Sequence, residues 1–202
     1  MVKVLVFGDS ISWGAFDTEY GGWVERLKTY FMQSYEKKEI GIYNLSVSFN
    51  NTRSVLEFLE QDIKKINKIE PEELILLFSI GSNDSMYVNE KNNIIVPVKE
   101  FEENLQKIIT LAKKCSKKII FTGLMKVDEK LTIPFGENEF WENKGIEKYD
   151  KIIEKICKNQ QVEFIPLFDL INEKDLKDGM HPHAKGHEKI FNCIKEYLLK
   201  TL

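Results

Sequence analysis

Short runs of apolar residues alternate along this chain with longer segments in which apolar residues recur at helical spacing. The apolar runs predict buried β-strands at 4–7, 40–46, 74–80, 119–122 and 162–165. The helical spacing predicts helices at 23–31, 52–66, 101–112, 146–156 and 184–198, the second of them with Thr52 as its N-cap. Strand and helix therefore alternate five times, which is typical of a parallel sheet with crossover helices.

The run at 74–80, Leu-Ile-Leu-Leu-Phe-Ser-Ile, is the strongest strand signal in the chain. It is apolar on both faces, as the central strand of a parallel sheet should be. The length of 202 residues suits one domain, and no linker interrupts the pattern, so we expect residues 1–202 to form a single domain. The predicted fold class is α/β, a flavodoxin-like three-layer α/β/α sandwich with a five-stranded parallel sheet.

Polar residues follow three of the predicted strands at the point where each strand ends. Asp9 and Ser10 come after the first strand, 48–50 after the second and 81–84 after the third. In open α/β sheets, ligands bind outside the carboxyl ends of the strands. Gly8 permits a sharp turn, so Ser10 is placed where a reactive hydroxyl would be useful. From this stretch alone, a residue that merely caps the next segment is an open alternative.

A fourth polar cluster, Asp-Gly-Met-His-Pro, precedes the last predicted helix. It favours a reactive Ser10 over a residue that only caps the next segment. A serine hydroxyl needs a base to take its proton, and His181 is the natural base for Ser10. Asp178 lies three residues upstream, close enough through a glycine turn to hold the other imidazole nitrogen. The backbone N–H groups of Ser10 and Phe49, with the Asn83 amide, could stabilise an oxyanion. Each cluster alone also fits an ordinary turn or cap, so their order and placement carry the argument.

These stretches resemble the sequence blocks of the SGNH hydrolase superfamily, which comprises the GDSL-type esterases, lipases and acylhydrolases. Phe-Gly-Asp-Ser-Ile-Ser at 7–12 resembles the first block and Gly-Ser-Asn-Asp at 81–84 the GxND block. Asp-Gly-Met-His-Pro at 178–182 resembles the DxxH block, and the residues at 184–190 resemble the start of the family's last helix. The resemblance covers nearly the whole chain.

The resemblance implies that Ser10 is the nucleophile and that Asp178 and His181 complete a catalytic triad. It also implies that Asn83 is an oxyanion donor. The family usually has a glycine in its second block, whose N–H joins the oxyanion hole, and the alignment places Phe49 there. The Phe49 N–H is retained, but an aromatic side chain disfavours a positive φ angle and would narrow the acyl site.

Large apolar side chains in the loops of this sheet edge could line a substrate pocket. The candidates are Trp13, Phe16, Tyr20, Phe49, Met86, Tyr87, Met125 and Trp141. Of these we single out Trp13, Phe49, Met125 and Trp141, the last two from a long connection at 124–141. For each residue alone, packing of its loop onto the domain is the alternative.

Three histidines lie close together in sequence, His181, His183 and His187, and their spacing alone would be compatible with a metal site. No carboxylate or cysteine completes a ligand set, and His181 is better used with Ser10. His187 falls on the apolar face of its helix, where a hydrogen-bonded core histidine is expected. We therefore predict no metal and no organic cofactor, with metal-assisted hydrolysis at these histidines as an alternative.

Composition and charge argue against several other classes of protein. The formal net charge is −3 with Lys and Glu interspersed, so no basic stripe exists for nucleic acid. No apolar run is long enough to span a membrane, and no signal peptide is visible. Cys115, Cys157 and Cys193 are far apart and odd in number, which predicts a reduced, cytoplasmic protein. The oligomeric state stays open.

The leading hypothesis is a serine acyl-hydrolase that cleaves small carboxylic esters, short-chain or acetyl esters above all. Acetylated sugars, lysophospholipids and acyl thioesters are also consistent with the family. The alternative is a non-catalytic module that binds a nucleotide or a sugar phosphate on the same fold. The complete Ser-His-Asp set argues against that alternative, because a degenerate site should not retain all three residues.

Overall fold

Five parallel strands form the main sheet of the structure, a computed structural model that describes residues 1–33, 39–68, 71 and 73–202. They are β1 (Val2–Gly8), β2 (Ile40–Asn44), β3 (Glu73–Ser79), β5 (Lys118–Thr122) and β7 (Glu163–Ile165). Their order across the sheet is β2-β1-β3-β5-β7, and Leu5 of β1 pairs with Tyr43 on one side and Leu76 on the other. The predicted α/β fold with a five-stranded parallel sheet is confirmed.

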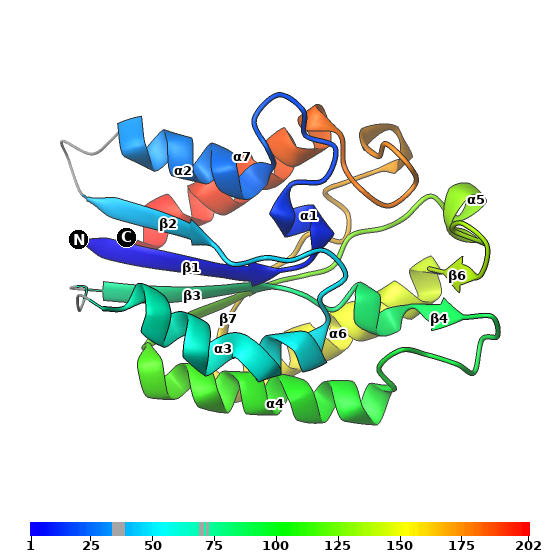
Figure 1. Ribbon diagram of the computed structural model, residues 1–202, viewed down its shortest axis with the longest axis horizontal. Helices are drawn as coiled ribbons and strands as arrows, with labels where there is room; N and C mark the ends of the chain where they lie inside the picture. The colour runs from blue at the N-terminus through cyan, green and yellow to red at the C-terminus, as the bar shows by residue number, and fades with distance from the viewer. Residues whose placement is uncertain (34–38, 69–70, 72) are drawn as a thin grey trace.

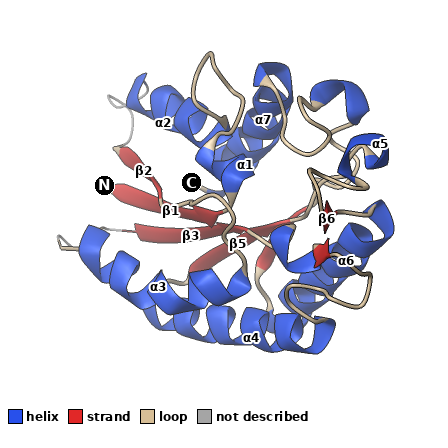
Figure 2. Ribbon diagram, turned by 45° about the vertical axis from the view of Figure 1, so that its right-hand side comes forward, coloured by secondary structure: helices blue, strands red, loops and turns tan. Residues whose placement is uncertain are grey.

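Helices cover both faces of this sheet. They bury the apolar side chains that the strands present on each face. The long helices are α2 (Trp23–Gln33), α3 (Thr52–Ile66), α4 (Val98–Cys115), α6 (Asn143–Gln160) and α7 (Ala184–Thr201). Figure 1 shows α2 and α7 above the sheet and α3 and α4 below it, and Figure 2 shows the same layers from another side. Within β1, Val4 and Val6 pack toward α2 and α7, whereas Leu5 and Phe7 pack toward α3, α4 and α6.

The strand order places the switch point of the sheet between β1 and β3, where successive connections leave toward opposite edges. Ligands of open α/β sheets bind outside the carboxyl ends of the strands at this point. Figure 1 shows α1 (Ser10–Trp13) directly beyond the end of β1. A 3₁₀ turn, Asn83–Ser85, follows β3. The fold therefore brings two of the predicted polar clusters to the same place.

Two local predictions were wrong. The N-cap of α3 is Asn51 and not Thr52, since the Asn51 side chain accepts hydrogen bonds from the N–H groups of Arg53 and Ser54. Thr52 is the first helical residue and is fully buried. The segment after Asp9, expected as a loop, begins with the short helix α1, and Asp9 caps it.

The two long connections at 85–97 and 124–141 contain structure that their sequences did not predict. Strands β4 (Tyr87–Val88) and β6 (Glu139–Phe140) pair antiparallel, and α5 (Glu129–Thr132) precedes β6. The rings of Tyr87 and Phe140 stack with centroids 4.9 Å apart. A second 3₁₀ turn, Glu173–Asp175, lies before α7. The connection at 124–141 is therefore attached to the segment that follows β3.

Candidate active site

Ser10 is the first residue of α1, and the two residues before it, Gly8 and Asp9, fix its position at the end of β1. The Asp9 side chain caps the helix, with Oδ1 accepting from the Ile11 N–H at 3.0 Å. A Cβ atom at Gly8 would lie 2.6 Å from the Ser12 side chain. Gly8 does not have a positive φ angle, so its backbone conformation alone does not require glycine. Glycine is needed there because α1 packs directly on the strand end.

Ser10, His181 and Asp178 form a continuous chain of hydrogen bonds. The Ser10 Oγ lies 2.8 Å from the His181 Nε2, and the His181 Nδ1 lies 2.8 Å from the Asp178 Oδ2. The other carboxylate oxygen, Oδ1, accepts from the backbone N–H groups of Met180 and His181 at 3.0 and 2.8 Å. An ionised carboxylate only accepts, so Nδ1 carries a proton and Nε2 is free to accept the Ser10 proton.

The electrostatics of the site favour an ionised Asp178. Burial opposes its charge, but the hydrogen bonds from the His181 ring and from two backbone N–H groups outweigh burial and hold the pKa below its usual value. Asp9 behaves differently, because burial raises its pKa to about 6. Asp9, which precedes Ser10, and Asp178, which contacts His181, therefore differ in proton affinity.

Gly179 allows the loop that carries Asp178 and His181 to approach the 124–141 connection. Its φ is 93°, and a Cβ atom would lie 2.6 Å from the Leu131 Cβ. The backbone oxygen of Gly179 also accepts from the Asp128 N–H at 2.7 Å. The position of the His181 loop thus depends on a segment about fifty residues upstream, which the sequence motif did not indicate.

Asn83 lies at the same edge, 5 % exposed, and is tied to the loop after β2. Its Nδ2 donates to the Asn50 carbonyl at 2.9 Å, and the Asn50 side chain donates to the Gly8 carbonyl at 3.3 Å. Asp84 accepts from both the backbone N–H and the hydroxyl of the buried Thr52. These bonds connect the segments that follow β1, β2 and β3, so the N–H groups at this edge are held in fixed positions.

Phe49 adopts the positive φ angle that its side chain was expected to disfavour, with φ of 64°. It is the third residue of a four-residue turn closed by a hydrogen bond from the Asn50 N–H to the Val47 carbonyl at 3.2 Å. Turns of this shape favour glycine or asparagine at that position. The Phe49 side chain is 67 % exposed, so no packing of its ring compensates the strained backbone.

The four predicted pocket residues fall into two groups. Trp13 and Phe49 are exposed at the sheet edge, and Met125 is half-buried. Trp141 differs from the prediction: it is 1 % exposed, and its ring N–H donates to the Ser82 carbonyl at 3.2 Å. Its burial follows from the β4–β6 pairing, which draws the end of the 124–141 connection into the core. Trp141 is therefore a core residue bonded to the segment that follows β3, and it does not line an open pocket.

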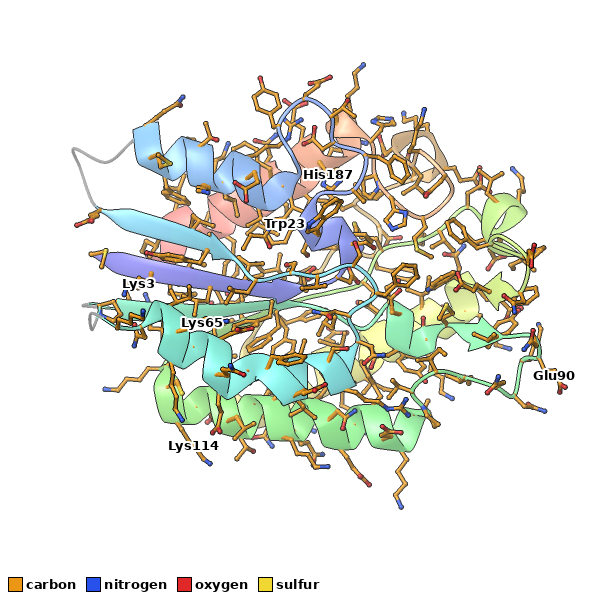
Figure 3. All side chains as sticks on the ribbon, viewed as in Figure 1. Lys3, Trp23, Lys65, Glu90, Lys114 and His187 are labelled. Atoms are coloured by element: carbon orange, nitrogen blue, oxygen red, sulfur yellow. The ribbon has the colours of Figure 1, made fainter. Side chains whose placement is uncertain are left out.

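The three histidines do not converge. His183 caps α7, accepting from the Lys185 N–H at 3.2 Å. His187 is fully buried, as predicted, and its ring bonds the Ala15 carbonyl at 2.9 Å and the Trp23 N–H at 3.3 Å. Figure 3 shows His187 and Trp23 together below the loop at 14–22. In the described part of the chain, no three His, Cys, Asp or Glu side chains are grouped to hold a metal ion.

The loop at 14–22 is fixed by a buried ion pair that the sequence analysis missed. The Asp17 carboxylate accepts from the N–H groups of Glu19, Tyr20 and Gly22, and pairs with Arg26 at 2.8 Å. An acidic residue in a glycine-rich loop, followed by an arginine in the next helix, is the signal that could have found it. This loop presents the Phe16 ring to the His181 ring, with centroids 5.6 Å apart.

The sequence profile of the GDSL-like lipase/acylhydrolase family matches residues 4–194. The chain belongs to this family. Similar curated proteins include isoamyl acetate-hydrolyzing esterase of Saccharomyces cerevisiae, 26 % identical over 99 % of this chain and 85 % of the yeast protein. Isoamyl acetate-hydrolyzing esterase 1 homolog of Homo sapiens is 24 % identical over 95 % of this chain and 79 % of its own length.

Among solved structures, the GDSL-type chain resembles Axe2, an acetylxylan esterase from Geobacillus stearothermophilus. The TM-score is 0.72 at 21 % identity, over 96 % of this chain and 92 % of that one. This likeness supports the fold. Family membership makes the protein a carboxylic ester hydrolase. Within the described ranges, every helix is too short or too polar to cross a lipid bilayer.

Proposed function

We propose that this hydrolase cleaves esters through a triad of Ser10, His181 and Asp178. The observation that carries the proposal is the pair of 2.8 Å contacts that joins the serine hydroxyl, the imidazole and the carboxylate. In this arrangement His181 is the base that takes the Ser10 proton, and Asp178 stabilises the imidazolium that forms. We further infer that residues 1–202 form one hydrolase domain.

Each step of the proposed reaction balances. The Ser10 Oγ attacks the ester carbonyl while its proton passes to the His181 Nε2, and the tetrahedral intermediate then expels the alcohol, which takes that proton. Water attacks the acyl-enzyme with His181 again as base, and Ser10 leaves with the proton returned. The backbone N–H groups of Ser10 and Phe49 and the Asn83 amide are the proposed oxyanion donors. The reaction needs no metal or organic cofactor.

Short-chain esters, acetyl esters above all, are the proposed substrates. The yeast relative is an isoamyl acetate-hydrolyzing esterase, the human relative is named as its homolog, and Axe2 is an acetylxylan esterase. The exposed Trp13 and Phe49 are the proposed apolar contacts of the bound ester.

Hydrolysis of p-nitrophenyl acetate, butyrate and octanoate by wild type and Ser10→Ala tests this function. We expect activity on the short esters that falls at least about a thousandfold in Ser10→Ala, since the residual rate then comes from binding and the oxyanion donors alone. Thr110→Ala, which removes an exposed hydroxyl on α4, is the control and should keep wild-type activity.

Equal background rates in wild type and Ser10→Ala would contradict the triad. They would favour a non-catalytic module that binds a nucleotide or a sugar phosphate. Binding of such a ligand would be detected as a rise in the midpoint of thermal unfolding. Loss of activity in EDTA would favour the metal-assisted alternative, because the serine mechanism involves no metal.

A further inference from the structure

A cavity of about 430 Å³ lies next to the segment that carries His181. One wall comes from the loop at 14–22, and the other from Lys177 and from residues 183–185 at the start of α7. The Phe16 ring lines the cavity and also contacts the His181 ring, with centroids 5.6 Å apart. The Lys177 N–H donates to the His181 carbonyl at 2.8 Å. The cavity is therefore one aromatic ring away from the imidazole.

The mechanism of ester cleavage relates this cavity to the leaving alcohol. In the proposed mechanism His181 returns its proton to the leaving alcohol, so the alcohol oxygen must lie on the imidazole side of Ser10. A substituent on that alcohol that passes Phe16 would reach the cavity. This step of the inference rests on the proposed function.

Phe16 is held in place at a cost in backbone energy. Its φ is 63° although it is not glycine, and its side chain is 48 % exposed. The flanking residues are fixed: Asp17 pairs with Arg26 at 2.8 Å, and the Ala15 carbonyl accepts from His187 at 2.9 Å. Strained residues persist where their surroundings determine them fully, and they cluster at ligand sites. An exposed ring fixed in this way is suited to contact a ligand.

The charge of the cavity lining selects the kind of ligand. Lys177 and Lys185 both line it, and, within the described residues, neither ammonium group is within 4.0 Å of a carboxylate. Glu19 also lines the cavity, but its carboxylate lies 4.0 Å from the Arg26 guanidinium. The lining itself carries Lys177 and Lys185 against Glu19, a net positive charge that favours an anion.

We propose that this cavity is the leaving-group subsite and that it takes an alcohol with an anionic group, a phosphate or a carboxylate, at its remote end. Lys177 and Lys185 bind the anion, and Phe16 covers the part of the alcohol that links it to the ester oxygen. The substrate class is then an acyl ester of an anionic alcohol.

The test compares kcat/KM for two anionic esters, 4-acetoxybenzoate and 4-acetoxyphenyl phosphate, with the neutral 4-acetoxybenzamide. The first two distinguish a carboxylate from a phosphate as the preferred anion. We expect the anionic-to-neutral ratio to fall about three- to tenfold in the double variant Lys177→Gln/Lys185→Gln. The ratio in wild type should also fall as ionic strength rises, since salt screens exposed charges. Both substitutions are on exposed side chains, so the fold is retained.

Lys114→Gln is the matched control. Lys114 lies at the end of α4 near the amino ends of the strands, away from α1 (Figure 3), so the ratio should be unchanged. A double variant that keeps the wild-type ratio for both anionic esters would overturn the subsite. Wild type that hydrolyses none of the three esters faster than Ser10→Ala would overturn the proposed function, and with it this inference.

Discussion

Phe16 and Phe49 occupy the same position in two separate turns at the candidate active site. Each is the third residue of a four-residue turn, closed by the N–H of Asp17 in one and of Asn50 in the other, both at 3.2 Å. Their φ angles are 63° and 64°, and both side chains are exposed. Because glycine or asparagine is preferred at this position, the two phenylalanines are present against the local preference of the backbone.

Replacement of Phe49 should reveal the strain. We expect Phe49→Gly to be about 1 kcal/mol more stable to urea than Phe49→Ala, because only glycine adopts the left-handed region without steric cost. Both variants remove the exposed ring, so the comparison isolates the backbone. Equal unfolding midpoints with equal m-values would show that the turn carries no strain at Phe49.

Asp178→Asn should reduce kcat on a short ester by a factor on the order of 10³, because the amide no longer fixes the imidazole tautomer or stabilises the imidazolium. The measurement is steady-state hydrolysis with circular dichroism as a check of folding. Asp169→Asn is the control, since Asp169 is exposed and pairs with the exposed Lys126. Activity of Asp178→Asn within about tenfold of wild type would rule out the assigned role.

Asn83→Ala should reduce kcat about 10²- to 10³-fold with a smaller change in KM, because an oxyanion donor acts mainly in the transition state. Asn138→Ala serves as the control: its exposed amide donates to the Asn89 side chain at 3.1 Å. A rise in KM at unchanged kcat would instead make Asn83 a residue that binds the ground state.

The sheet could be predicted from the sequence because its signal is local and repeated. Each strand is a short apolar run, and each long helix shows its own periodic face. The site residues Ser10, Asn83 and His181 could be proposed because parallel strands bring the segments that follow them to one edge. Family resemblance then assigned a role to each of them.

The remaining features depend on contacts between distant segments. Strands β4 and β6 have two residues each, too few for a pattern, and the stacking of Tyr87 on Phe140 joins segments about fifty residues apart. That pairing buries Trp141, which sequence alone places in an open loop. The positive φ of Phe49 opposes its intrinsic preference, so no propensity argument predicts it. Only the hydrogen bonds of Asn50 and Asn83 around it show how the turn is held.

The pH dependence of stability should reflect the buried carboxyl group of Asp84. Burial raises its pKa to about 7 from the usual 3.8, and the hydrogen bonds from Thr52 offset only part of this effect. The folded protein therefore keeps a proton that the unfolded chain releases, so the free energy of unfolding declines as pH rises from about 4 to about 7. Asp9, with a pKa raised to about 6 by burial, acts in the same sense. The lowered pKa of Asp178 makes the free energy of unfolding rise with pH, but only at pH values below this range.

Urea unfolding at about pH 5 and about pH 7.5 measures this decline, which we expect to be about 2 kcal/mol or more in wild type. Asp84→Asn places a neutral amide where the protonated acid sits, so its free energy of unfolding should change less between the two pH values. Asp169→Asn removes an exposed carboxylate and should keep the wild-type decline. If Asp84→Asn and wild type lose stability equally, Asp84 is ionised in the folded protein throughout this range, and the Thr52 hydrogen bonds compensate its burial in full.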